Sequence, residues 1–409
     1  MTTELRVLRP AEWDDWYARV ELAFGGVPAA AETRALYHDL IEPERAMGAW
    51  DGTDCVGTAG SYAFRLSVPG GAPVPTAGVC MVSVLATHRR RGILTAMMRR
   101  QLDEVHSWGE PLAALTASEP EIYGRFGYGI ATEQLSLDID TVRARLSVPD
   151  DADGVRLRIT TPGSVRDECE AVYARRVAAR PGMLARRPHW DRAPLLDPES
   201  DRRGSSPLQC VMAERDGESV GYARYAISRG WTPEGPDGAV VLRDLEALDP
   251  GAYAALWRFL FSIDLTSRLR APDRPVDDPL LHLVSDVRRC SPRLRDGLHL
   301  RIVDVGGALE ARTYARPVDV VLEVADAFCL WNEGRWRLTG DSKGAGCERT
   351  RDPADLALSV RDLGTAYLGG ASLAALAGAG RVQELRAGAL AEASGAFRSS
   401  VAPWLPHGF

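Results

Sequence analysis

The sequence has 409 residues, which at roughly 150 residues per domain predicts two to three domains. Lysine and arginine contribute 49 residues and aspartate and glutamate 56, so the formal net charge is −7. This sign is opposite to that of a typical nucleic-acid-binding chain. No long uninterrupted apolar run occurs, and the start, MTTELRVLRP, lacks the apolar stretch of a signal peptide. We therefore expect a cytoplasmic protein without nucleic-acid or membrane partners.

The seven cysteines predict buried thiols rather than disulfides or a zinc site. Their number is odd, the two closest lie 18 residues apart, and no CxxC or HxxxH pair occurs. We expect no metal cofactor.

The first 145 residues alternate between segments with the apolar spacing of helices and segments with that of strands. Helices are expected over residues 13–24, 30–41 and 91–108, and strands over residues 45–50, 55–68, 78–85 and 113–117. The continuous apolar run at residues 78–85 is typical of a central strand buried on both faces.

An aspartate-rich stretch, VPDDADG at residues 148–154, indicates a linker between domains. The region after it repeats the order of strands and helices of the first, which suggests an internal duplication. A third region has expected strands over residues 299–304, 318–325, 334–339 and 356–360 and expected helices over residues 361–369 and 382–397. The sequence thus predicts a mixed α+β and α/β chain with domains over residues 1–147, 148–294 and 295–409. Its apolar end, VAPWLPHGF, is expected to dock rather than to fray.

The stretch at residues 82–109 combines a buried strand, a basic turn and a helix. Free N–H groups at a helix start form a phosphate site, because the helix dipole lies behind them. Gly92 would let the main chain approach an oxygen closely, and Arg89, Arg90 and Arg91 supply positive charge. The alternative is a surface basic cluster that caps a strand.

Two motifs carry a resemblance to a known family. The spacing Arg89-x-x-Gly92-x-Leu94 resembles the pyrophosphate-binding turn of GNAT acetyltransferases, with leucine where glycine or alanine is usual. About thirty residues later, ASEPEIYGRFGYG occupies residues 117–129. Together the motifs resemble those of the Eis (enhanced intracellular survival) acetyltransferases. The resemblance implies two GNAT-type domains and a C-terminal sterol-carrier-protein-like α/β domain, and assembly into a homohexamer.

The resemblance also implies that acetyl-CoA is the co-substrate. Its pantetheine arm would lie along the strand before the turn and its pyrophosphate on the turn itself. The expected cofactor-binding residues are Val82, Ser83, Val84, Arg89, Arg90, Arg91, Gly92, Ile93, Leu94, Thr95, Ser118 and Glu119.

Acetyl transfer needs an acid for the departing thiolate and a base for the amine. The resemblance assigns the acid to Tyr123 and the base to the α-carboxylate of the C-terminal residue, Phe409. Tyr128 is the competing tyrosine and is expected to be a packing residue. His88 and His407 are alternative bases, because an imidazole titrates near neutral pH.

Members of the family acetylate amines, and aminoglycosides are their best-known acceptors. No acidic residue occurs between Glu21 and Glu32, and Gly408 stands where some relatives carry an acid. A more apolar acceptor pocket would be lined by Trp13, Trp16, Phe24 and Trp50, with Trp13 and Phe24 as the expected substrate-binding residues. The alternative is that at least half of these four are core aromatics. The alternatives are a lysine side chain or natural-product amine as acceptor, or a non-catalytic protein that binds an apolar ligand.

Overall fold

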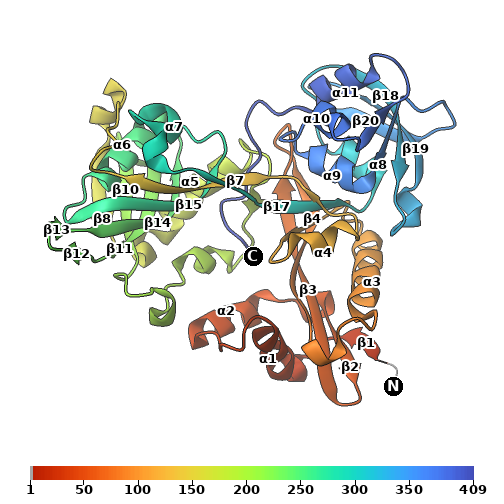
Figure 1. The fold of residues 1–409 in the computed structure, drawn as a ribbon, viewed down its shortest axis with the longest axis horizontal. Helices are drawn as coiled ribbons and strands as arrows, with labels where there is room; N and C mark the ends of the chain where they lie inside the picture. The colour runs from red at the N-terminus through yellow and green to blue at the C-terminus, as the bar shows by residue number, and fades with distance from the viewer. Residues whose placement is uncertain (1–2) are drawn as a thin grey trace. The chain divides into compact units, whose positions relative to one another are not determined.

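The structure is a computed structural model that describes residues 3–409 (Figure 1). Its contacts divide the chain into two compact units. The first unit holds the residues up to Thr132 together with Gly297–Pro403 and Gly408–Phe409. The second unit holds Glu133–Asp296 and Trp404–His407. Each unit is described by itself below.

The first unit contains two sheets. The strands of its larger sheet follow the order β1 (Glu4–Val7), β2 (Ala46–Asp51), β3 (Asp54–Ser67), β4 (Pro73–Val84), β5 (Leu112–Thr116), β17 (Leu298–Ile302) and β6 (Gly129–Ile130). Only the β4–β5 pair of this series is parallel. A parallel pair needs a crossover, and helix α3 (Ile93–Ser107) supplies it.

Side chains alternate between the two faces of this sheet. On one face Ala77 and Val79 of β4 pack against Met98 and Leu102 of α3. Helices α1 (Trp13–Ala23) and α2 (Ala31–Leu40) belong to the other face. There a Cβ added at Gly60 would lie 3.7 Å from the Trp16 ring.

The smaller sheet of the first unit comes from the C-terminal region. Its strands follow the order β20 (Ala345–Arg349), β19 (Gly334–Gly340), β18 (Val318–Ala325), β21 (Leu356–Ser359) and β22 (Val382–Glu384). Its helices are α8 (Val305–Glu310), α9 (Val360–Tyr367), α10 (Leu373–Gly378) and α11 (Ala389–Phe397). The continuous helix expected over residues 382–397 is wrong, because Val382–Glu384 pairs with β21 and the helix begins only after Gly388, whose φ is +90°.

The second unit is built on one main sheet. The strand order is β16 (Arg293–Asp296), β7 (Glu133–Asp140), β15 (Thr266–Pro275), β14 (Gly238–Ala247), β11 (Glu218–Ser228), β10 (Gln209–Arg215) and β8 (Arg156–Thr160). The parallel pair β14–β15 is joined by α6 (Pro250–Phe261), the same arrangement as β4–α3–β5. The helix begins at Pro250 because the Asp249 carboxylate accepts a hydrogen bond from Ala252 N at 2.8 Å.

The remaining α-helices and strands are α4 (Pro120–Gly124) in the first unit and α5 (Arg166–Val177), α7 (Leu280–Leu283), β9 (Leu184–Ala185), β12 (Trp231–Thr232) and β13 (Gly235–Pro236) in the second.

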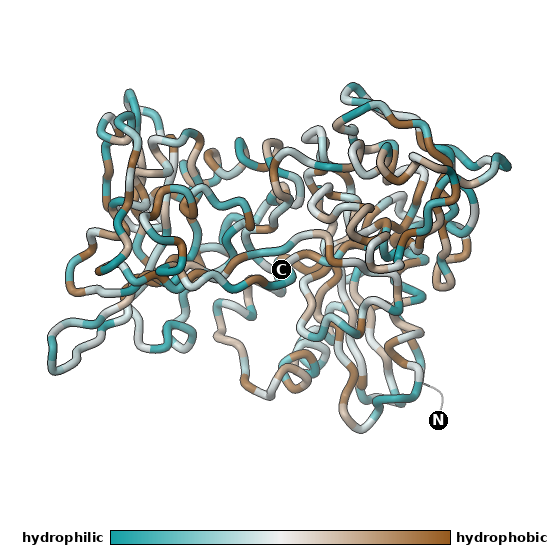
Figure 2. Tube along the Cα trace, turned by 45° about the horizontal axis from the view of Figure 1, so that its top comes forward, coloured by the Kyte–Doolittle hydropathy of each residue, from teal (hydrophilic) through white to brown (hydrophobic). Residues whose placement is uncertain are grey.

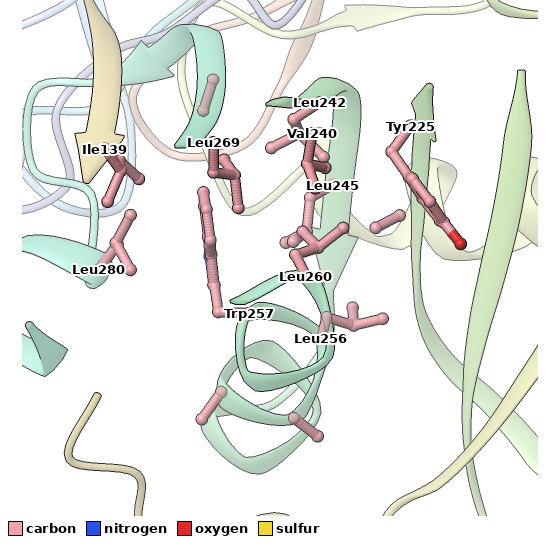
Figure 3. Close-up of a cluster of buried hydrophobic side chains, with 14 of the residues drawn as sticks. Ile139, Tyr225, Val240, Leu242, Leu245, Leu256, Trp257, Leu260, Leu269 and Leu280 are labelled. Atoms are coloured by element: carbon pink, nitrogen blue, oxygen red, sulfur yellow. The ribbon is translucent and has the colours of Figure 1, made fainter. Parts of the chain in front are cut away.

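The core of the second unit forms where α6 covers its sheet (Figure 3). Leu256, Trp257 and Leu260 of the helix are fully buried against Val240 and Leu269 of the strands. Hydrophobic and hydrophilic segments alternate along the chain, and several of the outermost loops are hydrophilic (Figure 2). All seven cysteines are buried and unbridged, which confirms the expectation for the thiols. No helix within residues 3–409 is both long and apolar enough to cross a membrane.

Contacts group two strands differently from the expected domain limits at residues 147 and 294. Strand β7 precedes the first limit but pairs with β15 and β16 in the second unit. Strand β17 follows the second limit but pairs with β5 and β6 in the first unit. The aspartate-rich stretch at residues 148–154 forms a short 3-10 helix, Asp150–Gly154, within the second unit. Its composition carries no information on which sheet a strand joins.

Candidate active site

Strands β4 and β5 separate part of the way along their length. Their parallel register runs from Thr76 opposite Leu112 to Gly78 opposite Ala114, although β4 continues to Val84. Beyond this register β4 carries a bulge, where Met81 has a φ of +52° and the pairing with β3 shifts by one residue. A bulge bends its strand, and the register of β4 with β5 ends at Gly78 and Ala114, so backbone groups beyond this point need other partners.

A buried hydroxyl pair holds the bulge in place. Thr58 Oγ1 of β3 donates to the carbonyl oxygen of Met81 at 2.7 Å and lies 2.7 Å from Ser83 Oγ. Both side chains are buried. The bulge is therefore a specified feature of the strand.

The basic turn leads from β4 into α3. Arg90 and Gly92 both have left-handed backbones, with φ of +63° and +80°. A Cβ added at Gly92 would meet no atom within 4 Å, so the glycine faces open space. The first intrahelical bond at this end runs from Ala96 N to Gly92 O, which leaves the N–H groups of the first helical turn available to an anion. Arg89, Arg90 and Arg91 are exposed around it.

The packing of Leu94 explains why leucine can stand where the turn usually has glycine or alanine. It packs on the apolar core beneath α3. A larger side chain at this position therefore adds to the core and leaves the backbone of the turn free. His88 takes part in the turn instead of standing free as a base, since its ring nitrogens lie 2.8 Å from Thr87 Oγ1 and 3.3 Å from Asp51 Oδ2.

The expected cofactor-binding residues gather at one edge of the sheet. Val82 and Val84 lie on β4 after the bulge, and Ile93 and Thr95 lie in the first turn of α3. The exposed pair Ser118–Glu119 follows β5 and precedes α4. The carboxyl ends of parallel strands β4 and β5 meet at this edge, as ligand sites of open α/β sheets do.

Tyr123 lies in α4 and is partly buried. Burial raises the pKa of its hydroxyl to about 12, and the neighbouring Cys80 and Glu119 add smaller increases. The phenol is therefore protonated at neutral pH and holds a proton to donate. The reference pKa of a thiol is about 8.5 and that of tyrosine about 10. Because the pKa of Tyr123 is raised further above that of the thiol, proton transfer from Tyr123 to a thiolate is less favourable than the reference values imply.

The glycines of the second motif are explained by close contacts with arginines of the C-terminal region. A Cβ at Gly124 would lie 2.9 Å from the Arg361 guanidinium, and one at Gly127 would lie 2.6 Å from that of Arg301. Gly129 similarly contacts the Arg361 carbonyl oxygen. Sequence reasoning missed these two arginines, because nothing in the local pattern links them to a motif more than 150 residues earlier.

Tyr128 is a packing residue, as expected. It is 1% exposed, and its ring meets that of Tyr123 edge-on with 5.9 Å between centroids. It thereby limits the positions open to the Tyr123 ring.

The last two residues of the chain lie where β4 and β5 separate. A Cβ at Gly78 of β4 would be 3.1 Å from the Phe409 ring, and one at Gly408 would be 3.7 Å from Thr116 Oγ1 at the end of β5. The Phe409 ring also packs on Phe64 of β3. Tyr123 packs against the buried cluster that contains Ala77 and Val79, the two neighbours of Gly78 on β4. The same short segment of β4 thus adjoins both expected catalytic residues.

The preceding four residues, Trp404–His407, belong to the second unit. Trp404 donates from its backbone N to Pro181 O and from Nε1 to Asp273 O, both at 2.8 Å. His407 Nε2 lies 3.2 Å from the Tyr173 hydroxyl. The apolar tail is docked, as expected, and His407 has a structural partner.

The expected acceptor aromatics occupy different environments. Trp16 is fully buried and donates from Nε1 to Met47 O at 2.9 Å, and Trp50 is also buried. Trp13 is buried and stacks on Tyr17 with 5.1 Å between centroids. Phe24 is 60% exposed. Trp13, Trp16 and Trp50 are therefore core residues, whereas Phe24 is exposed.

Within residues 3–409 no three acidic, histidine or cysteine side chains gather as the ligands of one metal ion would.

The chain is similar to known proteins along its whole length. Two models described as acetyltransferase (GNAT) domains match residues 4–131 and 182–302, and a sterol carrier protein domain matches residues 305–406. An uncharacterized N-acetyltransferase of Streptomyces avermitilis is 68% identical over 100% of both chains. The N-acetyltransferase Eis of Mycobacterium tuberculosis is 35% identical over 95% of this chain and 96% of that protein. The crystal structure of Eis1 from Mycobacterium abscessus superposes with a TM-score of 0.85 at 35% identity and covers both chains completely.

Proposed function

The chain belongs to the Eis family of GNAT N-acetyltransferases, and from this premise we propose that it transfers acetyl directly from acetyl-CoA to a primary amine. Tyr123 is the general acid and the α-carboxylate of Phe409 is the general base. The single observation that carries the proposal is the position of the chain end beside Gly78 and Thr116, where β4 and β5 separate.

The residues at the edge of the sheet fit acetyl-CoA. A pyrophosphate would fit the open space beside Gly92 at the start of α3. It would accept hydrogen bonds from the free N–H groups of the helix and pair with the three exposed arginines of the turn. The unpaired edge of β4 beyond Gly78 suits the amide groups of a pantetheine arm. Acetyl-CoA supplies an activated acetyl thioester with a good leaving group, and no metal is required for this chemistry.

Tyr123 donates the proton that the departing sulfur needs. Its raised pKa keeps the hydroxyl protonated before transfer. Contacts of Gly124 and Gly129 with Arg361 hold the loop that carries it. The tyrosine therefore acts from a fixed position, which general acid catalysis requires.

The Phe409 carboxylate accepts the proton of the amine. The reference pKa of a chain-end carboxyl is about 3.5 and that of an alkylammonium about 10, so complete prior deprotonation would cost about 8–9 kcal/mol. Transfer becomes feasible when burial lowers the pKa of the amine, or when the proton leaves after the nitrogen has bonded to the acyl carbon. Both routes need a carboxylate at a fixed place, and the packing of the Phe409 ring against Phe64 supports this.

A chemically modified chain end tests the proposal. Amidation of Phe409, or an extension by a few residues, removes the carboxylate from its position. We expect thiol release from acetyl-CoA to fall to background with each of several amines, while the melting temperature and acetyl-CoA affinity are retained. The matched control is the same extension placed at the N-terminus. Undiminished turnover by the C-terminally extended chain would refute the role of Phe409.

Family membership favours an enzyme over the alternative of a non-catalytic protein that binds an apolar ligand. We propose further that the enzyme is cytoplasmic and assembles into homohexamers. The predicted acceptors are an aminoglycoside or, alternatively, a lysine side chain or a natural-product amine.

A further inference from the structure

The turn that follows Tyr123 closes on the backbone of Tyr123 itself. The carbonyl oxygen of Tyr123 accepts hydrogen bonds from Phe126 N at 3.0 Å and from Tyr128 N at 3.3 Å. Gly127 stands between these two donors and has a left-handed backbone, with φ of +85°. We call residues 123–128 the Tyr123 turn. The backbone position of Tyr123 depends on how this turn is held, because the turn is bonded to the tyrosine's own carbonyl group.

Arg301 of β17 lies against the middle of the Tyr123 turn. A Cβ added at Gly127 would lie 2.6 Å from Arg301 Nη1, 2.8 Å from Cζ and 3.0 Å from Nε. The guanidinium therefore occupies the place that a side chain at position 127 would take. Arg301 is fully buried, and β17 pairs with β5 through Arg301 opposite Ala113 and with β6 through Leu300. Sheet pairing on both sides thus fixes the strand from which the guanidinium projects.

Asp326 holds the guanidinium in its place. Arg301 Nη2 donates to both carboxylate oxygens of Asp326, at 2.9 and 2.6 Å. The carboxylate also accepts hydrogen bonds from Cys329 N at 2.9 Å and from Asn332 Nδ2 at 3.0 Å. Asp326 is buried, and it lies in the part of the chain matched by the sterol carrier protein domain. That domain therefore supplies the group that fixes Arg301.

A second contact joins the same segment to the Tyr123 turn. The ring of Phe328 meets that of Phe126 edge-on, with 5.1 Å between centroids. Phe328 is itself tied to the ion pair, since its backbone N donates to Asp326 Oδ1 at 3.2 Å. Cys329 belongs to the same buried cluster as Phe126 and Tyr128. The segment at residues 326–329 thus touches the turn directly through its side chains and indirectly through Arg301.

Stability does not account for an arginine at this position. Nε and Nη1 of Arg301 have no hydrogen-bond partner among residues 3–409. Burial of polar groups without hydrogen bonds costs free energy, and well-packed apolar residues often replace a buried ion pair without loss of stability. The arginine instead provides a rigid, flat group at one fixed place, which a flexible apolar side chain does not.

We propose that Arg301, held by Asp326, is a positioning residue for the general acid Tyr123. The proposal rests on the function proposed above and adds a residue to its machinery. Arg301 sets the path of the Tyr123 turn at Gly127, and the turn sets the place from which the phenol donates its proton to sulfur. Because a displacement of about 1 Å can cost up to about 10²-fold in rate, loss of this support should reduce kcat.

A double-mutant cycle tests the proposal. Arg301→Lys keeps a positive charge beside Asp326 but removes the flat guanidinium. We expect kcat to fall by about tenfold, with the Kd for acetyl-CoA nearly unchanged. In the Tyr123→Phe background the same substitution should lower kcat no further, because the acid that Arg301 positions is already absent. The rate of thiol release is measured with kanamycin, Nα-acetyllysine and 2-phenylethylamine, and the fastest of these amines is used for the cycle.

Arg312→Lys is the matched control. Arg312 is also a buried arginine of the C-terminal region, but its guanidinium donates to the carbonyl oxygens of Tyr367 and Phe397. Both variants should lose stability, whereas Arg301→Lys alone should lower kcat. Hydrogen exchange gives a readout without substrate, since exchange of the amides at residues 123–128 should become faster in Arg301→Lys alone.

Asp326→Asn provides a second route to the same test. The amide has nearly the shape of the carboxylate but lacks its charge, so kcat should fall by about three- to tenfold, again only when Tyr123 is present. This variant takes the place of Arg301→Lys in the cycle if the latter does not fold.

Equal losses of kcat with and without Tyr123→Phe would overturn the inference, because a purely structural role lowers both rates alike. An unchanged kcat in Arg301→Lys and in Asp326→Asn would also overturn it. A normal kcat in Tyr123→Phe alone would instead refute the proposed function, and so would the absence of thiol release with all three amines.

Discussion

The ring of Phe409 meets that of Phe64 edge-on, with 5.0 Å between centroids and 67° between the ring planes. Gly78 lies next to both rings, and a side chain at this position would overlap Phe64. The C-terminal residue is thus seated on β3 and β4, and its position depends on a strand that lies some 345 residues earlier in the chain.

Phe64→Leu should reduce turnover by about tenfold, because a loosely held Phe409 places its carboxylate less accurately. Loss of the edge-on pair should also lower the free energy of unfolding by about 1–2 kcal/mol. The measurements are kcat and chemical denaturation. The matched control is Phe397→Leu, since Phe397 forms a similar edge-on pair with Tyr314 at 5.2 Å in the C-terminal region. Equal losses of kcat in the two variants would show that stability alone accounts for the effect.

Tyr123→Phe should lower kcat by roughly 10²-fold or more, the usual share of general acid catalysis, and leave the Kd for acetyl-CoA nearly unchanged. Single-turnover kinetics and equilibrium binding measure the two quantities. Tyr128→Phe is the control, because Tyr128 is buried beside Tyr123 and its hydroxyl has no hydrogen-bond partner among residues 3–409. Normal turnover in the Tyr123 variant would remove this residue from the mechanism.

The pH dependence of kcat should reflect the raised pKa of Tyr123. A general acid works while protonated, so its loss of activity begins as the pH approaches the pKa, here about 12. The reference pKa of tyrosine is about 10. Because the pKa of Tyr123 is higher, we expect its ionisation to cause no decline in kcat between about pH 8 and pH 10. The measurement is kcat at saturating substrates across this range, with stability monitored in parallel. A decline with a midpoint near 9 that disappears in Tyr123→Phe would contradict the raised pKa.

Gly92→Ala should weaken acetyl-CoA binding, because the new methyl group projects into the open cradle at the start of α3. The left-handed φ of +80° should cost about 1 kcal/mol of stability in addition. Gly109→Ala provides the control, since Gly109 follows the other end of α3 with a φ of +70° and equally open space. Calorimetric titration and thermal unfolding separate the two effects. The expected result is a similar loss of stability in both variants and a loss of affinity in the Gly92 variant alone.

Arg90→Gly should weaken acetyl-CoA binding by about 1–2 kcal/mol, the size of a hydrogen bond to a charged group. Glycine is chosen because Arg90 has a left-handed backbone, with φ of +63°, so the substitution removes the charge without strain. Arg203→Gly is the control, because Arg203 is also an exposed arginine with a left-handed backbone, with φ of +51°, and lies outside the turn. The loss of affinity should shrink as salt is raised, because screening weakens the interaction in the unmodified protein. An unchanged Kd would show that the pyrophosphate lies elsewhere.

The local elements around the site were predictable from the sequence. The apolar run expected at residues 78–85 is the second half of β4, which begins five residues earlier and ends one residue earlier than expected. The turn with Gly92 leads into α3, whose ends differ from the expected helix 91–108 by one or two residues. Such features depend on neighbouring residues, whose spacing and backbone preferences are written in a short segment. The two motifs also identified the family, which the comparisons confirm.

Long-range pairing was decided only by the tertiary structure. The sequence around β7 and β17 contains no signal for the sheet that each strand joins. The contacts of Arg301 and Arg361 with the glycines of the second motif, and that of Phe64 with Phe409, join segments far apart in the chain. Each contact depends on how complementary surfaces pack after the sheets form, and no local periodicity encodes that outcome. The sequence by itself determined the family, the basic turn and the chemistry available, whereas tertiary packing decided where the chain end lies and which rings stand beside it.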